Sequence, residues 1–317
     1  MKISISQDAY LQNTGLQNRI INNRRLNLLK KNIMNHLKDF LKTQLIKVFP
    51  SAYKKRHYRF LENLNWNNIP AEEGELLLMP YFLNDNTLFF DIGANTGIYT
   101  SFAQKFIPGE SVYAFEPIPE LYTRLKYLFR KSNIYKMAFS NEISEKQFKI
   151  PSICGKEFKS RGTLNVSYKE NDETKSRVID VSTDTIDSFV KKKNISKIGF
   201  VKIDVEGHEL QVIEGGIETL KEQKPVLQIE IEQRHYQRNI SEIIDFIKDA
   251  GYFCYYLDPK AWILKKLEVD PVSLQKEDHF KTAQYIHNFI FLPVNTKWDS
   301  AVTSINQDIR LARSGNY

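Results

Sequence analysis

Short apolar runs alternate with helical patterns through most of the chain. Four of the runs are four to seven residues long and lie between polar residues, at positions 88–92, 112–115, 198–203 and 225–231. Runs of this kind are typical of strands buried on both faces of a parallel sheet. Most are followed by segments whose apolar residues recur every three or four positions, as in amphipathic helices. The pattern predicts an α/β domain built on a doubly wound parallel sheet.

The turn after the first apolar run combines glycines with the start of a helix. Residues 88–100 read LFFDIGANTGIYT, so Gly93 and Gly97 bracket the turn. Glycine tolerates positive φ and lets a ligand approach the backbone, while the first turn of the next helix presents unpaired N–H groups. We therefore expect a small polar or anionic ligand at this turn.

The spacing of the glycines narrows the choice of ligand. A nicotinamide dinucleotide site requires G-x-G-x-x-G, whereas this turn reads D-x-G-x-N-x-G and opens with Asp91, which would repel a pyrophosphate. Asp91 would instead attract a cation such as the amino group of S-adenosylmethionine. The second strand ends in Glu116, and an acid at that place can accept both ribose hydroxyls. The alternative is an ordinary turn with a solvated Glu116. Because the glycine turn with Asp91 and the acid at the end of the second strand occur together, we favour S-adenosylmethionine.

Composition and cysteine usage are those of an α/β domain with an appendage. The 317 residues are 42% apolar, which is ample for a core. No stretch approaches the roughly 18 apolar residues of a membrane span, and residues 1–10 lack the apolar segment of a signal peptide. Cys154 and Cys254 lie far apart and outside any metal-ligand spacing. We expect reduced thiols and a cytoplasmic protein.

The net charge of +7 is concentrated near the N-terminus. Residues 1–60 hold 13 Lys and Arg against two acidic residues, a balance of +11, and the remainder is slightly acidic. Residues 26–49 also have the apolar spacing of an amphipathic helix. Packing of this helix on the main domain is the favoured hypothesis. The alternative is that residues 1–60 bring the protein to an anionic membrane or a polyanion.

These patterns divide the chain into three parts. Residues 1–85 are predicted to form a basic helical extension and residues 86–293 the main domain, with a hairpin-like insertion at about 147–181. Residues 294–317 read as a polar tail that is helical over 305–312.

The end of the strand predicted at 198–203 and the residues after it, 202–209 (KIDVEGHE), form the densest group of chemically active side chains. A buried strand delivers Asp204 to the rim of the sheet, and we expect Glu206 and His208 to overhang the sulfonium of the cofactor. Methyl transfer to oxygen requires a positioned nucleophile and usually a base. These three residues are therefore the predicted catalytic residues. The alternatives are that Glu206 complements a helix dipole and that His208 caps a helix.

Further acids lie at the end of the strand predicted at 225–231 and directly after it. Glu230, Glu232 and His235 could join Asp204 around a divalent cation. Carboxylates at a strand rim have many other uses, and this spacing is not specific, so no metal site is predicted.

Together these segments resemble the FkbM family of methyltransferases. The resemblance covers about residues 86–293 and rests on residues 89–100 (FFDIGANTGIYT), 114–117 (AFEP), 183–187 (TDTID), 201–210 (VKIDVEGHEL) with Gly215, and 288–293 (NFIFLP). It implies a class I methyltransferase fold with a Rossmann-like seven-stranded sheet whose last strand is antiparallel. It also implies S-adenosylmethionine as the donor and a hydroxyl acceptor on a sugar or secondary metabolite.

Carried over by position, the resemblance implies that Asp91, Gly93, Asn95, Gly97 and Glu116 bind the cofactor. Ala138, at the end of a short strand predicted at 134–138, should come near the adenine, and Thr96 and Asp204 complete the predicted cofactor set. The chain has Ser140-Asn141 where many relatives have Ser-Asp, so the contacts to adenine stay open. The basic N-terminal region lies outside the resemblance.

The leading hypothesis is an S-adenosylmethionine-dependent O-methyltransferase acting on a sugar hydroxyl of a glycan, glycolipid or secondary metabolite. A nucleic-acid methyltransferase is the first alternative, but no RNA-binding module or base-methylating motif supports it, so nucleic acid is not an expected partner. The second alternative is a non-catalytic binding module on the same fold. The acids at positions 91, 116 and 204 argue against it.

Overall fold

A computed structural model describes residues 44–276, 278, 282 and 284–314 of the chain. The chain forms two compact units, residues 1–54 and 55–317. Most of the predicted amphipathic helix at 26–49 lies outside the described residues. Of the first unit, residues 44–48 are helical, and the side chains of Leu45, Val48 and Phe49 are more than half exposed. The association of residues 1–60 with a membrane or polyanion stays a prediction.

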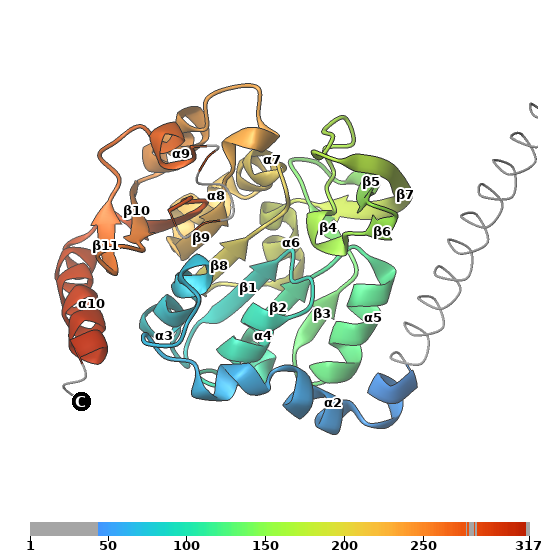
Figure 1. The fold of residues 1–317 in the computed structure, drawn as a ribbon, viewed down its shortest axis with the longest axis horizontal. Helices are drawn as coiled ribbons and strands as arrows, with labels where there is room; N and C mark the ends of the chain where they lie inside the picture. The colour runs from blue at the N-terminus through green and yellow to red at the C-terminus, as the bar shows by residue number, and fades with distance from the viewer. Residues whose placement is uncertain (1–43, 277, 279–281, 283, 315–317) are drawn as a thin grey trace, which may run out of the picture. The chain divides into compact units, whose positions relative to one another are not determined.

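The second unit is built on a mostly parallel sheet of eight strands (Figure 1). Five neighbouring strands run parallel, and β12 is antiparallel to both of its neighbours. In spatial order the strands are β11 (Ile263–Lys266), β10 (Tyr252–Asp258), β12 (Asn288–Pro293), β9 (Val226–Glu230), β8 (Ile198–Ile203), β1 (Leu88–Ile92), β2 (Val112–Phe115) and β3 (Asn133–Tyr135). The predicted fold class is confirmed, with one strand more than the expected seven.

The additional strand, β11, extends the edge of the sheet beside β10. Helix α10 (Thr296–Ser314) contributes Ile305 and Ile309 to the buried core. Its Asn306 accepts a hydrogen bond from Leu264 N at 2.6 Å and donates to Leu264 O at 3.0 Å. The Asn306 amide thus pairs with the backbone N–H and C=O of Leu264 on the edge strand, as the backbone of a further strand would. The predicted polar tail is therefore mostly helix, and β11 depends on a residue 42 positions later in the chain.

Aromatic side chains of the central strands show how the two faces of the sheet are covered. Phe89 stacks on Phe200 at 5.2 Å, and Phe82 packs against Phe200 at 5.4 Å. Phe90 points to the opposite face, where it meets Phe189 of α6 (Ile186–Lys193). Phe90 there belongs to the apolar core that also holds residues of α7 (Glu209–Glu214) and α9 (Ser241–Asp249).

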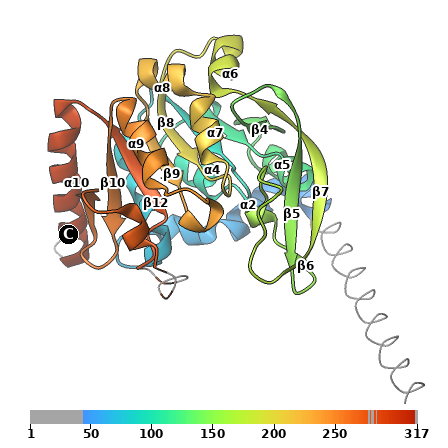
Figure 2. The same ribbon diagram turned by 90° about the horizontal axis from the view of Figure 1, so that it is seen from above.

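Helices flank the sheet in the views of Figures 1 and 2. The α-helices are α2 (Pro50–His57), α3 (Met79–Phe82), α4 (Ile98–Ala103), α5 (Pro119–Leu128), α6 (Ile186–Lys193), α7 (Glu209–Glu214), α8 (Ile217–Gln223), α9 (Ser241–Asp249) and α10. The 3₁₀ helices are η1 (Arg59–Asn63), η2 (Ala71–Leu78), η3 (Gly109–Ser111), η4 (Lys159–Arg161), η5 (Gln233–His235) and η6 (Pro271–Leu274).

A second, four-stranded sheet lies at the β3 side of the large one, to the right in Figure 2. It consists of β4 (Ala138–Phe139), β5 (Ser144–Ile153), β6 (Lys156–Glu157) and β7 (Glu173–Asp184). Strands β5 and β7 pair antiparallel along almost their whole length. Residues 158–172 connect β6 to β7, and this connection reaches the site described below.

The helix predicted after the strand at 198–203 is divided into α7 and α8 by two glycines, Gly215 and Gly216. A Cβ at Gly215 would overlap the carbonyl oxygen of Ser140, and one at Gly216 would lie 2.9 Å from Ile186 Cδ1. The backbone therefore approaches its neighbours more closely than an uninterrupted helix with side chains would allow. Among the described residues, no helix is both long and apolar enough to cross a membrane.

Residues 55–85 belong to the second unit, and Phe82 of this segment packs against Phe200 of the large sheet. Leu76, Leu78 and Met79 are at most 1% exposed. Glu75, in the same segment, is also buried, and burial raises the pKa of its carboxyl to about 7.

We expect Glu75→Gln to stabilise the protein at pH 8 and to change little at pH 5. Because the pKa of Glu75 is raised, folding stability falls as the pH rises from about 4.5 through about 7. A neutral amide removes that loss, which is about 1–3 kcal/mol. Urea unfolding at both pH values measures the difference, with the exposed Glu62→Gln as the control. A gain of equal size at both pH values would contradict this explanation.

Candidate functional site

Three neighbouring strands end level with one another at the carboxyl edge of the large sheet. Ile92 of β1 is in register with Phe115 of β2 and Ile203 of β8. Beyond the strands, Gly93 N donates to Phe115 O at 3.1 Å and Asp204 N donates to Ile92 O at 3.1 Å. Parallel pairing therefore brings the residues that follow these strands to one edge, where α/β proteins bind their ligands.

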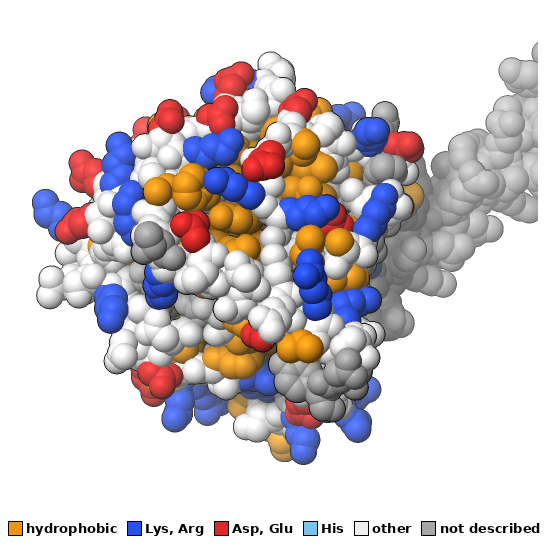
Figure 3. Space-filling model, turned by 90° about the vertical axis from the view of Figure 1, so that its left-hand side faces the viewer, with side chains coloured by type: hydrophobic (Ala, Val, Ile, Leu, Met, Phe, Trp, Pro, Cys, Tyr) orange, Lys and Arg blue, Asp and Glu red, His pale blue; other side chains and the backbone are white. Residues whose placement is uncertain are grey.

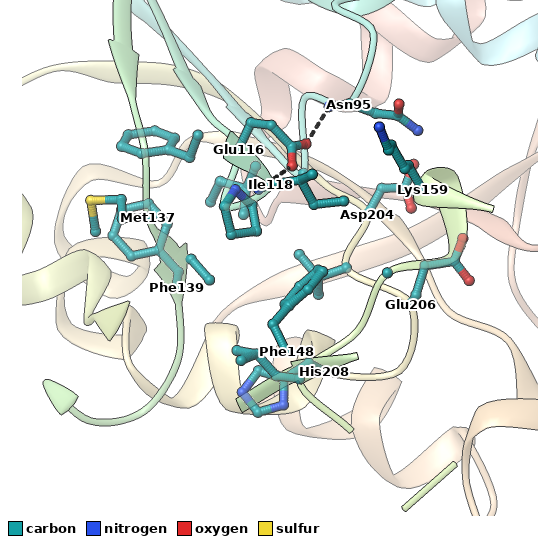
Figure 4. Close-up of a pocket in the computed structure, with 18 of the residues that line it drawn as sticks. Asn95, Glu116, Ile118, Met137, Phe139, Phe148, Lys159, Asp204, Glu206 and His208 are labelled. Carbon is teal, nitrogen blue, oxygen red and sulfur yellow. Dashed lines mark hydrogen bonds between the residues drawn. The ribbon is translucent and has the colours of Figure 1, made fainter. Parts of the chain in front are cut away.

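A pocket of about 550 Å³, partly open to solvent, lies at this edge (Figure 4). One end is lined by apolar side chains and the other by polar ones, with Glu116 between them. The polar end carries Asn95, Lys159, Asp204 and Glu206.

Glu116 is held rigidly in the wall of the pocket. It is 4% exposed, and its two carboxylate oxygens accept hydrogen bonds from Asn95 N and Ile118 N, each at 2.8 Å. Burial raises its pKa to about 7, although both backbone donors favour the charged form. A carboxylate offers about four lone-pair sites. Glu116 can therefore accept two further hydrogen bonds from a ligand diol.

The glycine turn has the backbone geometry that its sequence predicts. Gly93 and Gly97 have φ of 80° and 84°, and Asn95 is left-handed as well. A Cβ at Gly93 would overlap the Asp204 carbonyl oxygen, so only glycine fits there. Gly93 and Asn95 line the pocket. Gly97 is buried against α5, and the carbonyl of Thr96 accepts a hydrogen bond from Tyr58.

The apolar end of the pocket comes largely from residues that the sequence patterns do not single out. Met137 precedes β4, Ala138 and Phe139 form it, and Phe148 lies on β5. Leu164 adds to the lining from the connection between β6 and β7. Of these, only Ala138 is predicted. The others come from segments that lack both the glycine motif and a strand-end acid, so local sequence carries no signal for them.

Asp91 lies behind the glycine turn and not among the residues that line the pocket. It is 1% exposed, and its Oδ2 accepts hydrogen bonds from Thr100 N at 3.0 Å and Thr100 Oγ1 at 2.6 Å. Burial raises its pKa, while the charge of Lys202 opposes the shift. In this structure Asp91 holds the first turn of α4. Its contact with a cofactor amino group stays a prediction.

Asp204 and Glu206 form the polar rim of the pocket. Asp204 Oδ2 pairs with Lys202 Nζ at 2.8 Å. Glu206 has a left-handed backbone (φ 54°) and lies close to two basic side chains, Arg234 Nη2 at 3.5 Å and His235 Nε2 at 3.4 Å. Burial and the nearby charge of Glu230 raise the pKa of Glu206 well above its ordinary range.

His208 lines the pocket close to Phe148 (Figure 4). Its Nε2 lies 3.0 Å from Ser140 Oγ, and burial lowers its pKa to about 4. The imidazole is therefore neutral at pH 7. It also directly precedes α7 as the N-cap residue, but its side chain makes no capping hydrogen bond.

Arg234 links the polar rim to the connection between β6 and β7, and the sequence patterns give no sign of it. Its Nη1 donates to both oxygens of Glu170, at 2.8 and 2.9 Å, and to Tyr168 Oη at 3.1 Å. Its Nη2 donates to Glu232 Oε1 at 2.7 Å. Segments 60 or more positions apart are thus joined by one guanidinium group.

Asp204, Glu230, Glu232 and His235, the residues considered for a metal from the sequence, do not form one cluster in the structure. Glu232 is engaged by Arg234. In the described part of the chain, two sets of three potential ligands lie with their ligand atoms within 4.8 Å of one another. These sets are Asp204, Glu206 and Glu230, and Glu170, Glu206 and His235.

Two curated proteins are similar to part of this chain. The 31-O-demethyl-FK506 methyltransferase FkbM of Streptomyces tacrolimicus is 23% identical over 194 residues, which is 54% of this chain and 74% of that protein. The hexuronic acid methyltransferase AglP of Haloferax volcanii is 24% identical over 152 residues, 47% of this chain and 57% of that protein.

A solved structure, methyltransferase FkbM from Methylobacillus flagellatus KT, is 14% identical with a TM-score of 0.43. The alignment covers 70% of this chain, and this chain spans about half (48%) of that one. The family model for the methyltransferase FkbM domain matches residues 91–254, which is more than half of the chain. The protein therefore belongs to the FkbM family of methyltransferases, for which S-adenosylmethionine is the methyl donor.

Proposed function

We propose that the protein methylates a hydroxyl group of a sugar, on a glycan, a glycolipid or a secondary metabolite. The observation that carries the proposal is the pocket, in which Glu116 and the glycine turn lie beside the carboxylates of Asp204 and Glu206. The names of the two curated relatives, one acting on FK506 oxygen 31 and the other on a hexuronic acid, support an oxygen acceptor.

The residues at the pocket fit the donor. S-adenosylmethionine supplies an electrophilic methyl group on a positively charged sulfur. Glu116 would accept the ribose hydroxyls, and the apolar side chains of Met137, Phe139 and Phe148 would enclose the adenine. The backbone at Gly93 leaves room that a side chain would fill. Asn95, Thr96, Gly97 and Ala138 complete the proposed cofactor set, together with Asp91 behind the turn.

At the polar end, Asp204, Glu206 and His208 are the proposed catalytic residues. Transfer to a hydroxyl oxygen releases a proton, and a nearby base that accepts it accelerates the step. Asp204 offers a carboxylate oxygen, and the neutral His208 offers an imidazole nitrogen. Glu206 can accept the proton only in its ionised form, which its raised pKa disfavours but makes more basic. His208 is the weaker candidate because its Nε2 is within hydrogen-bond distance of Ser140. Positioning of the acceptor contributes to the rate in every case.

Nucleic acid is a less suitable acceptor. Nucleic-acid surfaces of proteins usually carry a basic stripe or patch. On the face shown in Figure 3, basic and acidic side chains are interspersed with small apolar areas. The polar end of the pocket is also rich in carboxylates, which would repel phosphates.

The acceptor is best identified by comparing extracts of a deletion strain and its parent by mass spectrometry. We expect a glycan or metabolite about 14 Da lighter in the deletion strain, the mass of one methylene. Purified enzyme with methyl-labelled S-adenosylmethionine should restore the mass, and linkage analysis should place the label on oxygen. Label found only in nucleic acid, or no labelled product, would contradict the proposal.

Substitution at the polar end should reduce turnover much more than donor binding. With the acceptor from that extract, we expect Glu206→Gln and Asp204→Asn to lower kcat by about 100-fold, in the range of lost general-base catalysis. Their affinity for S-adenosylhomocysteine should change by less than about 5-fold. Full turnover in both variants would remove these residues from the chemistry.

Binding of S-adenosylhomocysteine should release a proton from Glu116 near pH 6. Its pKa of about 7 leaves it mostly protonated there in the free protein, and hydroxyl donors favour the charged form. Calorimetry in buffers with different ionisation heats measures this release. Glu116→Gln should abolish it and weaken binding by about 30-fold or more, whereas the exposed Glu145→Gln should do neither. Unchanged proton release in Glu116→Gln would refute the assignment.

A further inference from the structure

We propose that Glu170, Glu206 and His235 bind a divalent transition-metal cation of the Mn²⁺ type at the polar rim of the pocket. Metal binding itself is independent of the methyl-transfer proposal.

The three side chains come from separate segments that meet at the rim. Glu170 lies in the connection between β6 and β7, Glu206 follows β8, and His235 ends η5 after β9. Their ligand atoms lie within 4.8 Å of one another. Ligand atoms about 2.1–2.2 Å from a shared cation are about 3–4.4 Å apart. Small side-chain movements would therefore bring all three into contact with one ion.

Besides its two acids, the cluster contains the buried imidazole of His235. Its side chain is 3% exposed, and Nε2 has no hydrogen-bond partner although it lies 3.4 Å from Glu206 Oε2. A buried polar atom without a partner costs about 1–3 kcal/mol. The lone pair of a neutral imidazole is a common metal ligand. A cation between His235 and Glu206 would satisfy both.

The position of the imidazole is fixed by its surroundings. Gly207 has φ of 91°, and a Cβ there would lie 2.8 Å from His235 Cβ. The ring also packs edge-on against Tyr168, with ring centroids 4.8 Å apart. The loop after β8 can therefore approach His235 closely, and the ring is held toward Glu206.

The surrounding carboxyl groups favour an added cation. Four of them, on Glu170, Asp204, Glu206 and Glu232, share three basic side chains, Arg161, Lys202 and Arg234, in the ion-pair network of the rim. Glu230, which lies beside Asp204 and Glu206, adds a fifth carboxyl group. Acidic groups therefore outnumber the basic side chains of this network, which suits a divalent cation.

Arg234 shares these carboxylates with the proposed ion. It donates to both oxygens of Glu170 and lies 3.5 Å from Glu206 Oε2. A carboxylate has about four lone-pair sites, so one guanidinium and one metal can be accommodated on each. Two carboxylates suit Mn²⁺, Mg²⁺ and Ca²⁺ alike, whereas one imidazole favours a transition metal. The set as a whole therefore fits Mn²⁺ better than Ca²⁺ or Mg²⁺, which prefer oxygen ligands alone.

The test is electron paramagnetic resonance of the full chain titrated with Mn²⁺ after chelator treatment, without donor or acceptor. We expect loss of the free Mn²⁺ signal with one site per chain, and electron spin-echo modulation from a coupled ¹⁴N nucleus. His235→Gln should abolish the ¹⁴N modulation and weaken binding at least 10-fold. Glu206→Gln should weaken binding to a similar extent but keep the modulation. Glu145→Gln is the control and should match the unsubstituted protein.

A cooperative thermal unfolding transition like that of the unsubstituted protein will show that both variants are folded. No Mn²⁺ binding by the unsubstituted protein at millimolar concentration would overturn the proposal and leave His235 and Glu206 as a simple buried pair. Binding without ¹⁴N modulation, or binding unaffected by either substitution, would overturn it as well. None of these results depends on which acceptor the enzyme uses.

Discussion

The site depends on the parallel pairing of β1 between β2 and β8. Because Ile92 is in register with Phe115 and Ile203, the next residue of each strand arrives at the same level of the sheet edge. Gly93, Glu116 and Asp204 are those residues. A shift of one position in either pairing would turn a carboxylate from the pocket to the core, because side chains alternate between faces. The aromatic core that secures this register therefore also fixes the distances within the site.

Buried carboxylates determine the electrostatics of the pocket. Glu116 is stabilised by two backbone N–H groups, and Asp204 is paired with Lys202. Glu206 lies among further acids, and its contacts to basic side chains are long, with Arg234 at 3.5 Å and His235 at 3.4 Å. Acidic groups are therefore concentrated at the polar end, where a positively charged sulfonium and a departing proton would both be stabilised. The same concentration of acids favours a metal ion there.

The sequence predicts the parts of the site that depend on local rules. The strand–turn–helix pattern requires glycine at 93 and 97, and the positive φ of both residues agrees with it. The position of the acids at the strand ends is also predictable, because parallel strands end at the same edge of the sheet. Asp91 shows the limit of this reasoning. Its position is predictable, but its side chain turns inward to Thr100 rather than into the pocket.

Residues brought in by tertiary packing could not be found in this way. Phe148 and Leu164 reach the pocket from the region read as an insertion, and their sequence pattern is that of any hairpin. Arg234 and Glu170 are 64 positions apart and meet only in the folded chain. Strand β11 likewise depends on Asn306 of α10. Each of these contacts joins residues far apart in the chain, and a single sequence does not show which distant residues meet.

A crystal structure of the complex with S-adenosylhomocysteine tests the central claim most directly. The prediction is that both ribose hydroxyls lie within hydrogen-bond distance of the Glu116 carboxylate. The adenine should pack between Met137, Phe139 and Phe148, and the sulfur should face Asp204 and Glu206. A ligand bound elsewhere, or bound here with its ribose away from Glu116, would contradict the assignment of this pocket as the methyl-donor site.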